Sequence, residues 1–327
     1  MLKNTILGFF FISFSILSQQ IDAGACLGKS ASEIHLQPGE SASQQAGNVD
    51  DSRERLEPSN SRNVERSGHD SSKWHFGYHN IPEWGSHHPD CKGKKQSPVD
   101  LNPSVMIQLE VEQPFVWTGY RKPPMNMTVV NNGHTVQLSG YWSDDNIPRI
   151  SGGTLTGDYV FLQLHFHWGT TDDSGSEHTI NNVGLPLEMH MVHYKKSYGS
   201  AAKAMKNKDG LAVIGILYKI DKMQSNGIQL MLKNFKDFKS PGRATPIQPF
   251  PLSKFNLNFP GEYVSYSGSL TTPPCSEIVT WIIPVYPRFM SQKQIDKFRQ
   301  ISLAGGDDHN NRPVMPLNRR ALNYIGH

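Results

Sequence analysis

Two runs of alternating apolar and polar residues constrain the fold of this chain more than any other feature. The first run covers residues 162–168. Because successive side chains of a β-strand point to opposite faces, His165 and His167 share a face with Gln163. The other face is apolar and is expected to lie in the core. That apolar face carries Leu162, Leu164 and Phe166.

The second run, residues 187–193, repeats the pattern. Glu188, His190 and Val192 share one face of this expected strand. Between the two runs, residues 172–175 contain Asp, Ser and Gly, which favour a turn. If the second strand returns antiparallel beside the first, His190 joins the two histidines of the first run.

Three imidazoles on neighbouring strands are typical of a catalytic zinc site with an open fourth position. Imidazole also accepts copper, but no thiolate or methionine arrangement in the sequence indicates that metal. The alternative is a set of three core histidines with ordinary hydrogen bonds. The residues alone favour metal binding by His165, His167 and His190 but leave that alternative open.

Short strand-like runs recur throughout residues 73–327, and long helical periods are scarce. We therefore predict a mainly β single domain with short helices, built on a large, mostly antiparallel twisted central sheet. The expected strands include residues 127–131, 135–138, 159–168, 187–194, 211–218 and 278–284. Short helices are expected at residues 225–234 and 291–300, the second with a serine cap.

The N-terminus has the pattern of a signal peptide, residues 1–25. Lys3 precedes an apolar run at residues 6–17, and Ala23-Gly24-Ala25 offers a cleavage site. The run is too short to span a bilayer, and no second run of spanning length follows. We therefore expect a secreted, extracellular protein with no membrane span.

Residues 26–72 are polar, have no apolar period and are expected to be disordered. The whole chain has 327 residues and a formal net charge of only +3. It also lacks a basic run interleaved with aromatic residues, so we exclude a nucleic-acid partner.

Secretion changes how the three cysteines are interpreted, because disulfides form in oxidising compartments. Cys91 and Cys275 both lie in the region expected to fold, and they are the expected pair. Cys26 is left over. It stays free, links two chains through an intermolecular disulfide, or is removed with the leader.

Several longer motifs follow one another along residues 74–320. They are Gln96-Ser97-Pro98-Val99-Asp100, Asn131-Asn132-Gly133-His134, residues 163–169, Gly175-Ser176-Glu177-His178-Thr179, residues 188–193 and Ser269-Leu270-Thr271-Thr272-Pro273-Pro274. With these motifs in this order, the chain resembles an α-class carbonic anhydrase, specifically a secreted one.

The resemblance implies Zn²⁺ as the cofactor, with His165, His167 and His190 as its ligands. It implies reversible hydration of CO₂ to bicarbonate and a proton, by attack of a zinc-bound hydroxide on CO₂. Zinc lowers the pKa of its bound water to near neutrality, which is a known property of carbonic anhydrases and not a prediction for this chain. Sulfonamides are the expected inhibitors.

The resemblance assigns roles to residues whose isolated patterns are ambiguous. Thr271 would accept the hydrogen bond of the hydroxide and pass its own proton to Glu177. Without the resemblance, Thr271 reads as a turn residue and Glu177 as a surface acid. His134 would carry protons between the site and solvent, because histidine titrates near working pH. A lone histidine after Asn-Gly otherwise reads as a turn residue.

Further residues would support the ligands and line the substrate site. Gln163, Glu188 and the carbonyl of Asn310 would orient the three histidines. CO₂ has no charge, so an apolar wall is expected around it. The residues implied at the substrate site are Val192, Val213, Leu270, Thr271, Thr272, Val279 and Trp281.

The resemblance also implies the Cys91–Cys275 disulfide, and Asn126-Met127-Thr128 is an acceptor for N-glycosylation. Two other hypotheses remain beside an active hydratase. One is a silent binding module of the same fold, although such relatives usually lack a zinc histidine. The other is an extracellular matrix or mineral-associated protein whose polar N-terminal segment recruits partners.

Overall fold

The computed structural model describes residues 74–143, 146–257 and 261–326. The predicted signal peptide, the predicted disordered segment and Cys26 lie outside these residues. Within them, no helix is long and apolar enough to cross a membrane.

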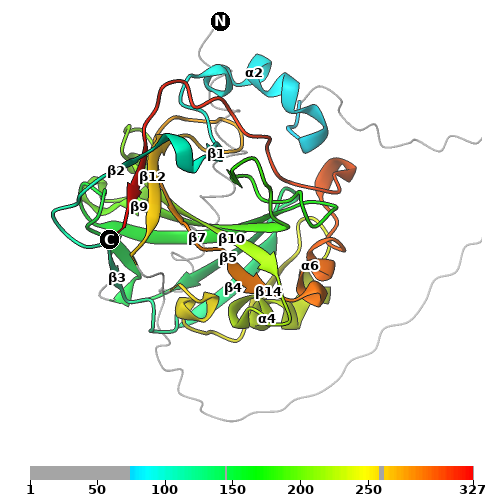
Figure 1. The fold of residues 1–327 in the computed structure, drawn as a ribbon. Coiled ribbons are helices and arrows are strands. Elements are labelled where there is room, and N and C mark those ends of the chain that lie inside the picture. The colour runs from blue at the N-terminus through cyan, green and yellow to red at the C-terminus, as the bar shows by residue number, and fades with distance from the viewer. Residues whose placement is uncertain (1–73, 144–145, 258–260, 327) are drawn as a thin grey trace, which may run out of the picture.

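One large sheet of 13 strands, counted over the described residues, forms the centre of the fold (Figure 1). Its main path runs β11-β4-β5-β7-β9-β10-β13-β12-β15-β2, and β3, β6 and β14 pair beside that path. These strands are β2 (Met106–Gln108), β3 (Val116–Thr118), β4 (Asn126–Asn131), β5 (Val136–Tyr141), β6 (Arg149–Ser151), β7 (Tyr159–Trp168), β9 (Leu187–Lys195), β10 (Leu211–Ile220), β11 (Ala244–Ile247), β12 (Tyr263–Gly268), β13 (Val279–Pro284), β14 (Arg288–Met290) and β15 (Leu322–Ile325). The short strands β1 (Asp100–Leu101) and β8 (Thr179–Ile180) form a separate parallel pair.

The helices are short and lie at the margins of the sheet, with α4 and α6 close together and α2 at the far end of the molecule (Figure 1). The α-helices are α2 (Trp84–His87), α3 (Ala201–Ala204), α4 (Asn226–Met231), α5 (Phe235–Phe238) and α6 (Gln292–Phe298). The 3₁₀ helices are η1 (Tyr78–Glu83), η2 (Pro89–Lys92), η3 (Pro103–Val105), η5 (Lys196–Tyr198), η6 (Leu232–Asn234), η7 (Leu252–Phe255) and η8 (Ala304–Gly306). Ser291 precedes α6 as predicted, and its backbone N–H donates to Oε1 of Gln294 at 3.1 Å.

The predicted fold class is confirmed: the protein is mainly β, with short helices around one large sheet. The predicted strand directions need a correction, because the sheet is mixed. Strand β10 runs parallel to both β13 and β14, and β15 runs parallel to β2. Sequence alternation reports which face a residue occupies and not the direction of the neighbouring strand, so it could not show these parallel pairs.

The antiparallel return of the second histidine strand is confirmed. Strands β7 and β9 are antiparallel neighbours, and their register places His165 directly opposite His190. The face assignment of Leu162 was wrong. A β-bulge between Phe161 and Gln163 inserts an extra residue, which turns the strand locally. Leu162 therefore packs with the cluster that contains Val192.

Two hydrophobic clusters hold the sheet, and a third small cluster holds the N-terminal segment. The large cluster buries Leu164 and Phe166 completely, as the alternation predicts. The second cluster lies around Val192, Val213 and Trp281. The third contains aromatic side chains and a disulfide, namely Phe76, Tyr78, Trp84 and the bonded Cys91 and Cys275.

The disulfide joins Cys91 to Cys275 across 184 residues of sequence, with 4.9 Å between the Cα atoms. A cross-link that closes so long a loop restricts the unfolded chain strongly.

Replacing both cysteines by alanine should therefore lower the free energy of unfolding by about 2–5 kcal/mol, measured by urea denaturation. Wild-type protein in excess reductant should lose the same amount, whereas the double variant should not respond to reductant. Equal stabilities of variant and oxidised wild type would contradict this expectation.

Candidate metal centre

Three histidine side chains converge where β7 and β9 pair. His165 and His167 come from β7, and His190 comes from β9. One nitrogen of each ring lies within 4.8 Å of a nitrogen of both others. The ring centroids are 5.1 Å apart for His165 and His167, and 4.4 Å apart for His167 and His190.

The outward nitrogens of the two β7 histidines are fixed by hydrogen bonds. Nδ1 of His165 lies 3.0 Å from Oε1 of Gln163, and Nδ1 of His167 donates to the backbone carbonyl of Asn310 at 2.7 Å. The inward Nε2 of His167 is buried and has no hydrogen-bond partner. A buried, unpaired imidazole nitrogen costs free energy unless something binds it. The donor set therefore fits a metal ion.

His190 is held through its other nitrogen. Its Nε2 lies 2.8 Å from Oε1 of Glu188, which leaves Nδ1 as the ligand atom. The same Glu188 oxygen lies 2.7 Å from Nδ1 of His178. The other oxygen accepts the backbone N–H groups of Glu177 and His178 at 2.9 and 2.8 Å. Glu188 is thus fully committed, so a second possible metal trio of His178, Glu188 and His190 is already satisfied by internal hydrogen bonds.

The protonation states suit metal binding. Burial, and then the neighbouring histidines, holds the pKa of His165 well below 6.5. Burial lowers the pKa of His167 to about 3 and also lowers that of His190. Burial alone would raise the pKa of Glu188, but His178 and His190 outweigh it and hold that pKa well below 4.5. The ligands are therefore neutral imidazoles at neutral pH, the form that coordinates metal.

Glu177 lies beside the ligands and is completely buried. Its Oε1 accepts the backbone N–H of Arg312 at 2.9 Å and lies 3.3 Å from Nδ1 of His167. Burial raises the pKa of the Glu177 carboxyl well above 4.5, while the Thr271 hydroxyl and the Arg312 N–H act against that rise. The structure thus brings Thr271 and Glu177 together, although they are 94 positions apart in the sequence.

The loop that carries Thr271 is anchored to the N-terminal part of the domain. Nε2 of Gln96 donates to the carbonyl of Cys275 at 3.1 Å, and the backbone N–H of Ser97 donates to Oγ of Ser269 at 2.9 Å. The disulfide adds a covalent anchor four residues after Thr271. Gln96 and Ser97 therefore help to hold the loop that carries Thr271 in place.

The predicted apolar wall is a contiguous surface of the second cluster. Val192, Val213 and Trp281 are direct cross-strand neighbours on β9, β10 and β13. The Trp281 ring lies 4.7 Å from the His190 ring, so this row ends at the metal ligands. Val279 and Leu270 pack in the same cluster. The backbone carbonyl of Thr272 accepts the N–H of Cys275 in the following turn.

His134 lies half-buried after the predicted turn, in which Oδ1 of Asn132 accepts its backbone N–H at 2.9 Å. Its ring stacks on Phe76, with centroids 4.0 Å apart and planes inclined by 16°. Burial lowers the pKa of His134 to about 4. Proton transfer was expected of His134 because a histidine ordinarily titrates near neutral pH. In this buried position the ring titrates well below neutral pH.

The sequence reasoning gave no role to several residues that complete the centre. His178 lies between Glu188 and Tyr266, whose hydroxyl is 2.6 Å from Nε2 of His178. Arg312 donates from its side chain to Oε1 of Gln96 and to the carbonyl of Ser97. No local pattern marks these residues, because their partners come from distant strands and loops.

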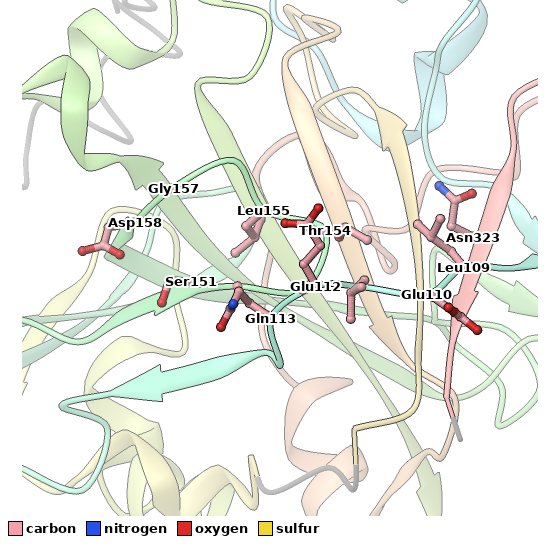
Figure 2. A pocket seen from close by; sticks show the side chains of 13 residues that line it. Leu109, Glu110, Glu112, Gln113, Ser151, Thr154, Leu155, Gly157, Asp158 and Asn323 are labelled. Carbon is pink, nitrogen blue, oxygen red and sulfur yellow. The ribbon is translucent and has the colours of Figure 1, made fainter.

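A cleft of about 600 Å³ lies elsewhere on the molecule. Figure 2 shows the side chains that line it. It is lined from the loops at residues 109–113 and 151–158 and by Asn323 of β15, and its acidic side chains, Glu110, Glu112 and Asp158, are exposed. It shares no residue with the metal centre. Asn126, the predicted acceptor for N-glycosylation, is exposed at the start of β4.

A large mixed sheet that presents three histidines beside a buried carboxylate has the ligand set expected of a catalytic zinc site of the three-histidine class. The model of the eukaryotic-type carbonic anhydrase family matches residues 79–325. The chain belongs to that family and is a carbonic anhydrase enzyme with zinc as its cofactor. Its substrates are CO₂ and bicarbonate, and sulfonamide inhibition is expected.

The chain is also similar in sequence to several known carbonic anhydrases. Carbonic anhydrase 3 of Bos taurus is 35% identical over 254 residues, which cover 76% of this chain and 93% of the relative. Carbonic anhydrase 3 of Rattus norvegicus is 34% identical over 252 residues, covering 76% and 92%. Carbonic anhydrase 3 of Homo sapiens is 34% identical over 264 residues, covering 77% and 98%.

Glu188 offers the sharpest test of the centre. Glu188→Gln removes the charge that holds His190 and His178, so zinc affinity should fall about 10–100-fold. Competition with a chelator of known affinity measures this loss. The exposed Glu110→Gln is the matched control and should bind zinc like wild type. Unchanged affinity in a folded Glu188→Gln protein would show that this carboxylate does not support the ligand.

Proposed function

We propose that this chain hydrates CO₂ at a zinc ion held by His165, His167 and His190. The observation that carries the proposal is the hydrogen bonding of the three rings. Each ring has one nitrogen occupied by a partner, and the remaining nitrogens converge. Because each ring is fixed in one orientation, little reorganisation is needed when the metal binds.

Zinc at this position supplies a Lewis acid that makes a nucleophile from water near neutral pH. The residues around it do the positioning. Thr271 directs its hydroxyl proton to Glu177, whose Oε1 also accepts the Arg312 N–H, and both hydrogen bonds act against the burial that raises the pKa of this carboxyl. The hydroxyl oxygen of Thr271 is then free to accept a hydrogen bond from the attacking group. The row of Val192, Val213 and Trp281 excludes water from the place where uncharged CO₂ would bind.

Each turnover also requires a proton to leave the site. His134 is the proposed carrier, and it can accept a proton near neutral pH only when its ring leaves the stack on Phe76, because burial there keeps its pKa at about 4. Proton transfer is efficient when donor and acceptor have similar pKa values. Turnover in weak buffer should therefore depend on this ring.

His190→Ala tests the metal site directly. The variant lacks one of three ligands, so zinc retained after gel filtration should fall from one ion per chain to a small fraction. Stopped-flow CO₂ hydration should fall with it to the buffer rate. The matched control is His87→Ala, which removes an exposed histidine and should leave both values unchanged. A zinc-loaded wild-type chain that hydrates CO₂ no faster than buffer would falsify the hydratase assignment.

We further propose that the protein is a secreted carbonic anhydrase. The apolar run at residues 6–17 and the Ala23-Gly24-Ala25 site support secretion. The Cys91–Cys275 disulfide supports it as well, because disulfides persist in oxidising compartments. Exposure of Asn126 makes its acceptor sequence accessible to glycosylation.

Expression of the full chain in a eukaryotic secretory host tests this proposal. The medium should contain a protein whose first residue is Cys26, identified by N-terminal sequencing. Glycosidase treatment should lower its mass, and Thr128→Ala should abolish that change. Non-reducing electrophoresis reports whether Cys26 links two chains. Retention of the chain in the cell with its leader attached would contradict secretion.

A further inference from the structure

One segment, residues 304–310, connects the metal centre to the proton-transfer histidine. We call it the rim segment. At its end, Asn310 accepts from His167 through its carbonyl and donates from Nδ2 to the carbonyl of His134 at 3.0 Å. At its start, the backbone N–H of Ala304 donates to the carbonyl of Gly133 at 2.7 Å. The rim segment therefore fixes the backbone of His134 from both sides.

Asp307, in the middle of the rim segment, holds a different part of the molecule. Its Oδ2 accepts the backbone N–H of Tyr78 at 2.8 Å, and its Oδ1 accepts the backbone N–H of His79 at 3.1 Å. Nδ1 of His79 lies 2.8 Å from the same Oδ1. The Asp307 side chain is only 3% exposed, whereas the side chain of its partner His79 is 59% exposed. These hydrogen bonds join the rim segment to the start of η1.

The segment that Asp307 holds carries the ring on which His134 stacks. Phe76 lies two residues before Tyr78, and at Gly77 between them a Cβ would lie 2.6 Å from the end of the His79 side chain and 3.0 Å from Oδ2 of Asp307. The backbone is therefore packed tightly against the Asp307 carboxylate. The Phe76 ring then lies flat on the His134 ring.

We propose that Asp307 is a positioning residue that keeps Phe76 on His134 and so restrains proton export. The assignment rests on the role of His134 under the proposed function. The rim segment holds the His134 backbone, and through Asp307 it also holds the ring that covers the His134 side chain. Loosening Asp307 should free the side chain without disturbing the ligands, because no hydrogen bond of Asp307 goes to a ligand.

Two possible roles of Asp307 predict opposite changes in the pKa of His134 when Asp307 is replaced. The charged and titratable groups that act on His134 are Asp307, which raises its pKa, and His75, which lowers it; burial is the larger effect and lowers it to about 4. If Asp307 acted only as a charge, removing it would lower the pKa further. If it holds the stack, removing it exposes the ring, and the pKa should rise towards the ordinary value of about 6.5.

The experiment is a titration of the His134 Hε1 resonance by NMR in the full zinc-loaded chain. The resonance is assigned from its absence in His134→Ala. Asp307→Asn should raise the pKa of His134, and Phe76→Ala, which leaves the Asp307 charge in place, should raise it too. The matched control is Asp308→Asn, one residue along, because Asp308 is exposed and, among the described residues, its side chain pairs with His309 alone. It should leave the His134 pKa unchanged.

The kinetic arm measures CO₂ hydration in weak and in strong buffer. Asp307→Asn should increase turnover in weak buffer by about two- to fivefold, because a higher pKa makes His134 a better acceptor. KM and the rate in strong buffer should not change. Adding His134→Ala should remove the gain. A merely structural defect would lower both rates, which would overturn the assignment.

The two readouts separate this inference from the proposed function. A fall or no change in the His134 pKa on Asp307→Asn overturns positioning by Asp307, whatever the activity. A rise in that pKa supports positioning. If His134→Ala alone leaves turnover in weak buffer unchanged, His134 does not export the proton. The proposal that Asp307 restrains this export is then overturned as well. The η1 region should stay folded in Asp307→Asn, because Gly77, Asn80 and Trp84 bond within it.

Discussion

The carboxylate of Glu188 lies fully buried in the centre of the sheet, where an unpaired charge would cost several kcal/mol. Four donors compensate it: two backbone N–H groups, His178 and His190. Two of these bonds have a direct consequence for the site. The bond to His190 selects the nitrogen that faces the metal, and the N–H of Glu177 fixes the acid that serves Thr271. One buried charge thus orients both a ligand and the hydrogen-bond relay beside it.

The alternation of side chains along a strand predicted which residues of that strand share a face. It placed His165, His167 and Gln163 on one face and Glu188 beside His190, and the structure has these relations. It failed at Leu162, because a bulge changes the period without a local sequence signal. It could not show the parallel pairs of β10 either, since strand direction depends on how the whole chain is connected.

Contacts between distant segments were beyond the sequence patterns for a different reason. Asp307 reads as one of two adjacent acids in a glycine-rich loop, and only the fold brings it to Tyr78 and His79. Arg312 likewise bonds to Gln96, 216 residues away. Such pairs leave no periodicity, and the resemblance to a family, which suggested Thr271 and Glu177, assigned no role to Asp307 or Arg312.

The centre and the rim differ in how firmly they are held. The three ligand histidines lie on the paired strands β7 and β9, whose hydrogen-bond ladder fixes their backbone, and each ring has one nitrogen in a hydrogen bond, so the rings have little freedom to move. His134 has no such ladder on its outer side: an aromatic ring on an N-terminal segment covers it, and one carboxylate ties that segment down. Metal affinity and proton export can therefore vary independently. A substitution at Asp307 alters the solvation of His134, whereas the ligand nitrogens keep the partners that Gln163, Glu188 and Asn310 provide.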